Sequence, residues 1–255
     1  MTLRVFITGA SSGIGAALAR EYAKRGAVIG LTARREEFLR DLAGELDAQT
    51  AIYSLDVRDI NAIENAFADF TQKFGLPDIV IANAGVSRGT LTQEKEDLEA
   101  FQEILDINVM GMVKTFQPFV EPMLARKSGI LVGIASVAGA RGIPGSGAYS
   151  ASKAAAIKYL EALRVELRNS GVSVVTICPG YIKTPMTAKN PYSMPFILES
   201  SEAAQRFLKA IDQKKSIVTI PWQMGIVRFI LRRLPNWLFD MIFSKTGRKP
   251  RITKN

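Results

Sequence analysis

The stretch Thr8-Gly9-Ala10-Ser11-Ser12-Gly13-Ile14-Gly15 lies between a short apolar run, Arg4–Thr8, and a segment with helical periodicity, Gly13–Arg25. Gly9 can adopt backbone conformations that other residues avoid. Gly13 and Gly15 would allow a pyrophosphate to approach the backbone and the helix to pack close to the strand. The free N–H groups and the positive end of the helix dipole favour phosphate. The pattern predicts a phosphate-binding turn, with a purely structural strand-to-helix turn as the alternative.

Short apolar runs and helical segments alternate along most of the chain. Asp59–Phe74 is a second helical segment, with Ile63, Phe67 and Phe70 on one side. Alternation over about 220 residues predicts an α/β fold, a Rossmann-type doubly wound parallel sheet with helices on both faces. The expected strands are Arg4–Thr8, Val28–Thr32, Ala51–Leu55, Ile79–Ala82, Ile130–Ala135, Ser173–Ile177 and Ser216–Ile220.

The composition of the 255 residues excludes several kinds of site, because there is no His and a single Cys. A Ser-His-Asp nucleophile system, a His-ligated metal and an internal disulfide are all ruled out. The longest uncharged stretch, Asn169–Ile182, is shorter than the roughly 18 residues of a spanning helix. The N-terminus lacks the pattern of a signal peptide. We expect a cytoplasmic protein without a metal site.

The positive charge is concentrated near the C-terminus. Residues 222–255 contain eight Lys or Arg and one Asp, so they carry +7 of the total of +9, and residues 1–221 carry +2. A specific nucleic-acid binder needs basic residues across a folded face. The nearly neutral body argues against that class.

Four further segments follow the glycine turn in order: Asn83-Ala84-Gly85, Asn108, Ser136 with Tyr149-x-x-x-Lys153, and Pro179-Gly180. Together with the turn they resemble the motifs of the short-chain dehydrogenase/reductase family, of the classical type, over roughly residues 3–220. The resemblance implies a seven-stranded sheet of order 3-2-1-4-5-6-7 and a nicotinamide cofactor. We expect an NADP-binding catalytic domain over residues 1–221, with a substrate lid at about 181–200, and an amphipathic basic extension over 222–255.

The resemblance also implies where the cofactor lies. Asp56 and Val57 resemble the pair that meets the adenine ring, although Asp56 is equally typical of a strand-end cap. Asn83-Ala84-Gly85 resembles the segment that lines the adenine ribose, and Thr184, near the Ile182 backbone, the residue that holds the carboxamide. The expected cofactor-binding residues are Gly9, Ser11, Ser12, Gly13, Ile14, Gly15, Arg34, Arg35, Asp56, Val57, Asn83, Ala84, Gly85, Tyr149, Lys153, Pro179, Gly180, Ile182 and Thr184.

The second expected strand leads into Arg34 and Arg35 and has no acid at its end. An acid there usually accepts from the ribose hydroxyl of NAD, whereas Arg suits the phosphate of NADP. NADP(H) is therefore predicted over NAD(H), although Ser12 stands where many NADP-preferring relatives have a basic residue. Arg35 is also typical of an ordinary solvated side chain.

Tyr149 and Lys153 are four residues apart, so a helix would place them on one face. A Tyr titrates near ~10. A nearby ammonium, and an oxidised nicotinamide when one is bound, lower that pKa toward the range of efficient acid–base catalysis. The resemblance implies that Ser136 binds the substrate oxygen, that Lys153 holds the nicotinamide ribose and that Asn108 anchors a relay water. The expected catalytic residues are Asn108, Ser136, Tyr149 and Lys153, and the expected substrate residues are Ser136, Tyr149, Tyr181 and Met186.

The predicted reaction is hydride transfer between nicotinamide and a carbonyl or secondary alcohol. Met, aromatic and aliphatic residues in the expected lid favour a hydrophobic ketone or aldehyde that is steroid-, keto-lipid- or xenobiotic-like; the alternative is that they pack on the core. An NAD-linked alcohol dehydrogenase and a 3-oxoacyl thioester reductase stay open. A non-catalytic cofactor-sensing regulator is disfavoured because Tyr149 and Lys153 are both present.

The extension over residues 222–255 has two interpretations. Its apolar faces with Trp, fringed by Arg and Lys, can lie on an anionic membrane surface, which would be the inner face of a membrane. They can also cover a neighbouring subunit or roof the substrate pocket. A homodimer or homotetramer is expected, and Lys245–Lys254 is expected to be disordered.

Overall fold

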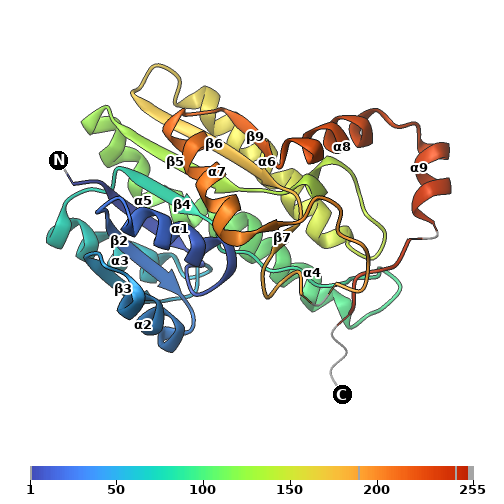
Figure 1. Ribbon diagram of the computed structural model, residues 1–255, viewed down its shortest axis with the longest axis horizontal. Helices are drawn as coiled ribbons and strands as arrows, with labels where there is room; N and C mark the ends of the chain where they lie inside the picture. Colours follow the sequence, from blue (N-terminus) through green and yellow to red (C-terminus); the bar gives the residue numbers. More distant parts are fainter. Residues whose placement is uncertain (1, 189, 245, 252–255) are drawn as a thin grey trace.

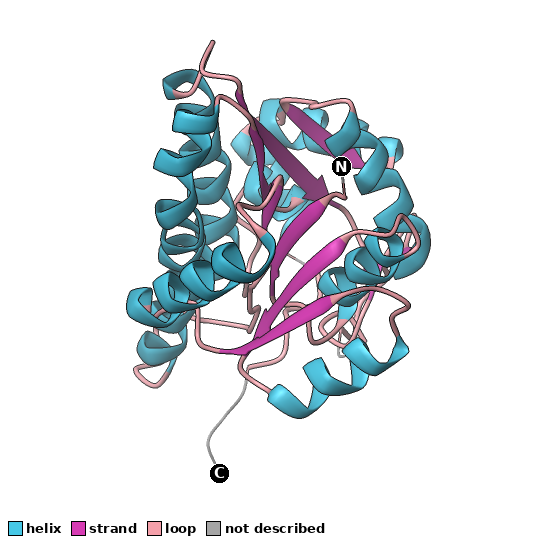
Figure 2. Cartoon of the chain, turned by 90° about the vertical axis from the view of Figure 1, so that its left-hand side faces the viewer, coloured by secondary structure: helices cyan, strands magenta, loops and turns pink. Residues whose placement is uncertain are grey.

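A computed structural model describes residues 2–188, 190–244 and 246–251 and has a parallel sheet between two layers of helices (Figures 1 and 2). Seven strands form this sheet in the order β3-β2-β1-β4-β5-β6-β9. The predicted fold is confirmed, and β9 is the seventh strand because the short β7 and β8 pair outside the main sheet. The strands are β1 (Arg4–Thr8), β2 (Val28–Ala33), β3 (Thr50–Ser54), β4 (Ile79–Ala82), β5 (Gly129–Ile134), β6 (Val172–Pro179), β7 (Ile182–Lys183), β8 (Leu198–Glu199) and β9 (Ile217–Ile220).

Helices cover both faces of the sheet. The helices α1 (Gly13–Ala23), α2 (Glu36–Glu45) and α7 (Ser200–Asp212) pack on one face, and α3 (Ile60–Phe74), α5 (Gly111–Arg126) and α6 (Gly147–Glu166) on the other. The remaining helical elements are α4 (Asp97–Leu105), the π-helix η1 (Asp106–Met110), the 3-10 helix η2 (Val137–Ala140), α8 (Trp222–Arg233) and α9 (Asn236–Phe243).

Strand β1 shows why these segments are nearly continuous apolar runs. Val5 and Ile7 belong to the cluster under α1 and α7, and Phe6 belongs to the cluster on the opposite face. All three are fully buried. Successive side chains of a strand alternate between faces, so a central parallel strand needs apolar residues at every position.

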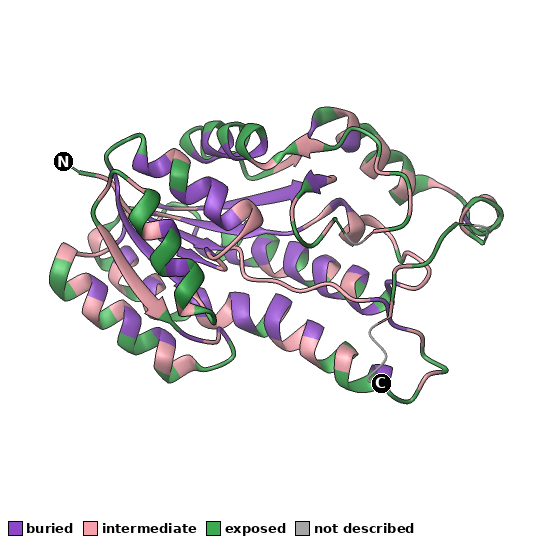
Figure 3. Cartoon of the chain, turned by 60° about the horizontal axis from the view of Figure 1, so that its bottom comes forward, coloured by how far each residue is buried: buried purple, intermediate pink, exposed green. Residues whose placement is uncertain are grey.

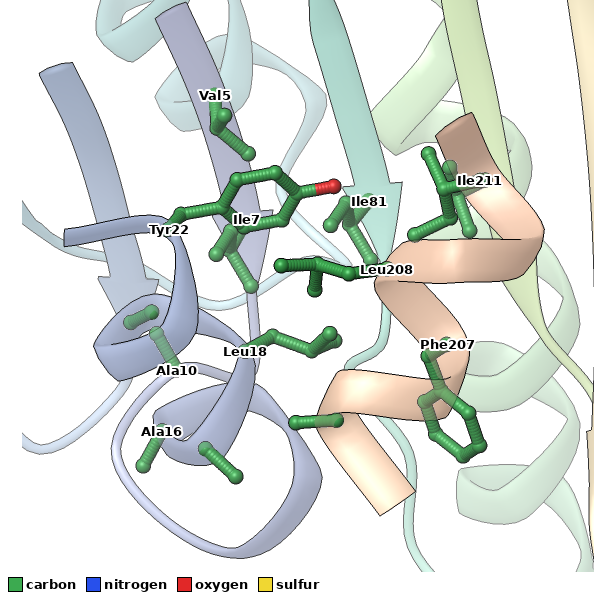
Figure 4. Close-up of a cluster of buried hydrophobic side chains, with 14 of the residues drawn as sticks. Val5, Ile7, Ala10, Ala16, Leu18, Tyr22, Ile81, Phe207, Leu208 and Ile211 are labelled. Atoms are coloured by element: carbon green, nitrogen blue, oxygen red, sulfur yellow. The ribbon is translucent and has the colours of Figure 1, made fainter. Parts of the chain in front are cut away.

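Figure 4 shows the packing that joins the two ends of the domain. Leu18 and Tyr22 of α1 meet Leu208 and Ile211 of α7 above the strands, and all four side chains are buried. Since α7 follows the expected lid, this contact anchors the far end of the lid to the helix that begins at the glycine turn.

The segment after β9 extends from the body and then returns (Figure 1). Helix α8 packs against β9 and η2, and Arg141 donates hydrogen bonds to the Leu231 and Leu234 carbonyls at its C-terminal end. Figure 3 shows the α9 end as mostly exposed. Among the described residues, none of the helices has the length and apolar character needed to cross a membrane.

The expected disorder of Lys245–Lys254 is wrong for residues 246–251, which pack beside the loop after β4 and helix α4. Two interactions account for this order. The Gly89 amide donates to the Pro250 carbonyl at 3.0 Å, and the Arg251 Nε donates to Asp97 at 2.8 Å. Lys245 and residues 252–254 lie outside the described residues.

Leu208→Ala tests the packing between α1 and α7. Leu208 is 1% exposed, so its truncation should lower the free energy of unfolding by about 2–5 kcal/mol, the cost of lost burial plus a cavity. The matched control is Leu98→Ala, because Leu98 is 66% exposed and its loss should change the value by less than about 0.5 kcal/mol. Urea unfolding followed by circular dichroism measures both. Equal effects of the two substitutions would contradict the described packing.

Candidate active site

A cavity of about 310 Å³ lies at the carboxyl ends of the parallel strands. It is placed where β1 and β4 lie side by side and the strand order reverses, the position at which open α/β sheets bind ligands. Its walls come from the glycine turn, the ends of β2 to β6, helix α6 and the start of the expected lid. The predicted residues that line it are Ser11, Ser12, Ile14, Arg34, Arg35, Asp56, Val57, Asn83, Ala84, Gly85, Ser136, Tyr149, Lys153, Pro179, Gly180, Ile182, Thr184 and Met186, together with Gly9 and Gly13.

The glycine turn is packed against the end of β4. Gly9 has φ +68°, and a Cβ there would lie 2.8 Å from the Ala84 Cα. Gly15 does not line the cavity; a Cβ on it would overlap the Gly9 carbonyl. The Asn83 side-chain amide donates to the Thr8 and Gly9 carbonyls, at 3.0 Å each. Asn83 therefore fixes the shape of the turn.

Helix α1 leaves its first amides available to a ligand. Ser12 is its N-cap residue and makes no side-chain capping hydrogen bond. Backbone N–H groups at a helix start, with the dipole behind them, form a ready site for phosphate. The close approach at Gly9 and the open start of α1 fit the pyrophosphate of a dinucleotide.

The far end of the cavity carries two exposed cations, Arg34 and Arg35. The Arg35 guanidinium lies 4.1 Å from the centroid of the Phe38 ring. Asp56 is held by Arg58, whose side chain donates to both carboxylate oxygens and whose amide donates to one. These hydrogen bonds, and to a smaller extent the charges of Arg58 and Arg34, hold the pKa of Asp56 below its ordinary value although burial opposes them. The contacts with Arg58 agree with the strand-end cap interpretation of Asp56.

Ser136, Tyr149 and Lys153 meet at the other end. Ser136 follows β5, and α6 presents Tyr149 and Lys153 on one face. The Ser136 hydroxyl and the Tyr149 phenol share a hydrogen bond. The Lys153 Nζ donates to the Ile134 carbonyl at 2.8 Å and lies 5.8 Å from the centroid of the Tyr149 ring. An alcohol, a phenol and a buried ammonium thus converge on one point of the cavity.

Asn108 lies behind this group rather than in the cavity wall. It is fully buried in η1, and π-helical turns often mark functional sites. Its side chain accepts from the Val86 amide at 2.8 Å and donates to the Val86 carbonyl and the Ser152 hydroxyl, each at 3.0 Å. The Asn108 amide therefore holds the loop after β4 against α6, and the relay water stays a prediction.

The segment after β6 closes the cavity. The Thr187 hydroxyl donates to the Ile182 carbonyl at 2.7 Å, and the Thr184 amide donates to the Thr187 hydroxyl at 3.0 Å. Met186 lines the cavity and is 39% exposed. Tyr181 does not line it; its ring lies 6.4 Å from the ring of Tyr192.

The family follows from comparison with known proteins. Residues 4–194 match the family model described as short chain dehydrogenase. An uncharacterized oxidoreductase of Myxococcus xanthus is 39% identical over 237 residues, which cover 92% of this chain and 93% of that protein. The chain belongs to the short-chain dehydrogenase family.

Solved structures that are similar to this chain include one with NADPH and one with NAD. An actinorhodin polyketide ketoreductase variant with NADPH is 28% identical, with a TM-score of 0.77, and the match covers 86% of this chain and 95% of that one. A 3-oxoacyl-[acyl-carrier protein] reductase from Brucella melitensis with bound NAD is 25% identical, with a TM-score of 0.75, covering 86% and 89%. Nicotinamide binding is thus a property of the fold, and the two structures differ in the cofactor they hold.

Burial sets the protonation of the acid–base groups of this short-chain dehydrogenase. It raises the pKa of Tyr149, and the hydrogen bond with Ser136 opposes this only in part. Burial also lowers the pKa of Lys153 to about 8, against a smaller effect of Cys178. The expected lowering of the Tyr149 pKa by Lys153 is wrong for this structure, because desolvation of the phenolate dominates. At neutral pH the phenol keeps its proton, so it is a hydrogen-bond donor.

Several cavity residues were not predicted from the sequence. They are Ala33, Leu55, Val86, Ile107, Ile134, Ala135, Pro185 and Thr187. Most are apolar residues at strand ends, which look like ordinary core positions in a sequence. Thr187 could have been found from the sequence, since a Thr three residues after Thr184 is typical of a turn in which a side-chain hydroxyl bonds the backbone. Among residues 2–188, 190–244 and 246–251, no group of acidic or Cys side chains has the arrangement of a metal site.

Proposed function

We propose that this short-chain dehydrogenase is an NADP(H)-dependent oxidoreductase that reduces a hydrophobic ketone or aldehyde to an alcohol. The observation that carries the proposal is the convergence of Ser136, Tyr149 and Lys153 on a cavity that also contains the glycine turn. When bound, the reduced nicotinamide supplies the hydride. The reverse oxidation uses the same groups.

Each side chain has a role that follows from its surroundings. The Ser136 hydroxyl binds the substrate oxygen and stabilises the negative charge that develops there. Tyr149 donates its proton to that oxygen, which fits a phenol whose pKa burial has raised. Lys153 stabilises the phenolate that remains and holds the cofactor ribose. Asn108 keeps α6 and the loop after β4 in register, and a water at this position would relay protons to Lys153.

The preference for NADP(H) rests on Arg34 and Arg35. Both are exposed, both line the cavity, and no acid stands at the end of β2. Guanidinium groups bind phosphate oxygens in pairs, so they favour the extra phosphate of NADP. The Arg35 guanidinium also lies over the Phe38 ring, 4.1 Å from its centroid.

The proposed substrate is hydrophobic because the expected lid exposes apolar side chains, one of which, Met186, lines the cavity. Met186, Phe196 and Ile197 of the expected lid are 39%, 51% and 41% exposed. Exposed apolar side chains that are close in sequence suggest a surface that is covered in use. Bound substrate would provide this cover.

Tyr149→Phe tests the proposed proton donor. Loss of the phenolic hydroxyl should lower kcat by at least about 100-fold, the contribution of a positioned general acid. Binding of NADPH should persist, since the ring and Lys153 remain. Steady-state reduction of a panel of ketones of increasing lipophilicity, with NADPH binding followed by fluorescence, measures both. Ordinary turnover by the variant would refute the assignment.

Arg34→Asp tests the cofactor preference. The variant should lose at least about tenfold in kcat/KM for NADPH relative to NADH, as expected for loss of a hydrogen bond to a charged group. Arg40→Asp is the matched control, because Arg40 pairs with Glu36 on the exposed side of α2. An unchanged ratio in Arg34→Asp would favour the NAD-linked alternative.

We propose that the C-terminal helices α8 and α9 contact an anionic membrane surface. Their exposed large apolar side chains are Trp222, Ile226, Phe229, Ile230, Trp237, Met241 and Ile242. Trp222, Ile226, Phe229 and Ile230 are spaced along one stripe of α8, beside the exposed Arg232 and Arg233. Trp and aliphatic groups fringed by Arg are typical of helices that lie in the membrane interface. This combination favours lipid over a neighbouring subunit.

Intrinsic fluorescence reads this contact directly, because Trp222 and Trp237 are the two tryptophans of the chain. Vesicles of phosphatidylserine and phosphatidylcholine at low salt should shift the emission to the blue, and pure phosphatidylcholine or high salt should weaken the shift. Phe229→Asp should reduce it, whereas the control Leu98→Asp on α4 should not. Analytical ultracentrifugation of the same proteins measures their oligomeric state, which is expected to be a homodimer or homotetramer. An absent shift, or a dimer that Phe229→Asp dissociates, would favour the subunit-contact alternative.

A further inference from the structure

The C-terminal strap, residues 246–251, reaches the loop after β4 and the Tyr149 ring from a part of the chain that the family motifs do not include. It is held at two places. The Gly89 amide donates to the Pro250 carbonyl, and Arg251 pairs with Asp97 at 2.8 Å and with Glu94 at 3.1 Å. The Asp97 side chain is 9% exposed and also accepts from the Leu91 amide. Removal of Arg251 would leave this nearly buried carboxylate without its charged partner, which is costly.

This anchoring places Lys249 beside the proposed proton donor. The Lys249 Nζ donates to the Ser87 hydroxyl at 2.6 Å and lies 5.6 Å from the centroid of the Tyr149 ring. The Lys153 Nζ lies at a similar distance, 5.8 Å, from the same centroid. Two ammonium groups therefore lie near one phenol ring, and the two have different partners.

Lys153 and Lys249 differ in how their charges are satisfied. Lys153 is buried, donates to the Ile134 carbonyl and has its place in the cofactor site. Lys249 is half-buried, and across the part of the chain that the structure describes no Asp or Glu pairs with it. An ammonium has three N–H donors, and the Ser87 hydroxyl takes one of them. Burial lowers the pKa of Lys249, so the cation is held at a cost that an anionic partner would offset.

The lid borders the same place. Gly247 of the strap lies close to Tyr192, because a Cβ on Gly247 would be 3.9 Å from the Tyr192 Cβ. Tyr192 belongs to the expected lid, and burial, together with smaller effects of Tyr181 and Tyr149, raises its pKa to about 12. The strap and the lid thus approach each other at Gly247 and Tyr192.

We propose that Lys249 and Ser87 form an anion-binding subsite, so that the substrate is a carbonyl compound that carries a carboxylate or phosphate close to its reacting carbon. The inference rests on the proposed reductase function and adds the charge of its substrate. Carboxylates and phosphates are the groups that a partly desolvated ammonium binds best. The apolar lid would hold the rest of the molecule, which makes the substrate amphiphilic.

The experiment compares each acid with its neutral counterpart. Reduction of levulinate and methyl levulinate, and of a long-chain keto acid and its methyl ester, is measured with NADPH as kcat/KM. The wild-type protein should prefer the acid of each pair. Lys249→Met should lower the acid-to-ester ratio by at least about tenfold, as expected for loss of a hydrogen bond to a charged group. Lys249→Arg, which keeps the charge, should retain most of the preference.

Arg248→Met is the matched control, since Arg248 is the exposed neighbour of Lys249 on the strap. It removes the same charge from the same segment and should leave the acid-to-ester ratio within about twofold. A comparison of kcat/KM for hydroxyacetone phosphate and for hydroxyacetone distinguishes a phosphate subsite from a carboxylate subsite. A larger Lys249-dependent ratio for this pair than for the keto acids assigns the subsite to a phosphate, and the reverse assigns it to a carboxylate.

The results that overturn the proposal are distinct from those that overturn the function. If the wild-type protein reduces esters and acids equally well, or if Lys249→Met and Arg248→Met lower the ratio alike, the anion subsite is wrong and the reductase stands. If NADPH binds but none of the carbonyl compounds is reduced, the proposed function fails and the subsite fails with it.

Discussion

The close packing of the glycine turn against the end of β4 is the contact on which the rest of the site depends. Gly9 and Gly15 approach Ala84, Asn83 and each other at distances that leave no space for a Cβ. Two hydrogen bonds from Asn83 hold the turn in this position. The approach brings the start of α1 to the point where the sheet reverses its order, so the free amides of the helix face the cavity.

The chemistry at the other end depends on burial. Helix α6 lies against the sheet, so Lys153 is withdrawn from water and donates to a strand carbonyl. The same burial keeps the Tyr149 phenol protonated and lowers the pKa of Lys153 to about 8. Asn108 contributes from beneath, because its buried amide joins the loop after β4 to α6. The acid–base groups are therefore positioned by the same packing that stabilises the fold.

The chain after β9 has two surfaces with different chemistry. Helices α8 and α9 expose apolar side chains to the outside, while the strap places the Lys249 ammonium beside Ser87 and the Tyr149 ring. The Arg141 guanidinium holds the point where α8 ends, through the Leu231 and Leu234 carbonyls, and stacks on the Phe239 ring of α9. A membrane contact on the outer surface and an anionic, amphiphilic substrate on the inner one would be mutually consistent, since such a substrate partitions to the same interface.

The sheet, the glycine turn and the pairing of Tyr149 with Lys153 could all be predicted from the sequence. These follow from local rules, because strand and helix periodicities place residues two and four apart on known faces. The Tyr149 pKa was predicted in the wrong direction, since burial by distant elements outweighs a neighbour on the same helix. The position of Lys249, beside Tyr149 and hydrogen-bonded to Ser87 162 residues earlier in the chain, became visible only in the folded structure. No periodicity relates positions so far apart, and the return of the strap depends on Arg251 meeting a buried Asp97.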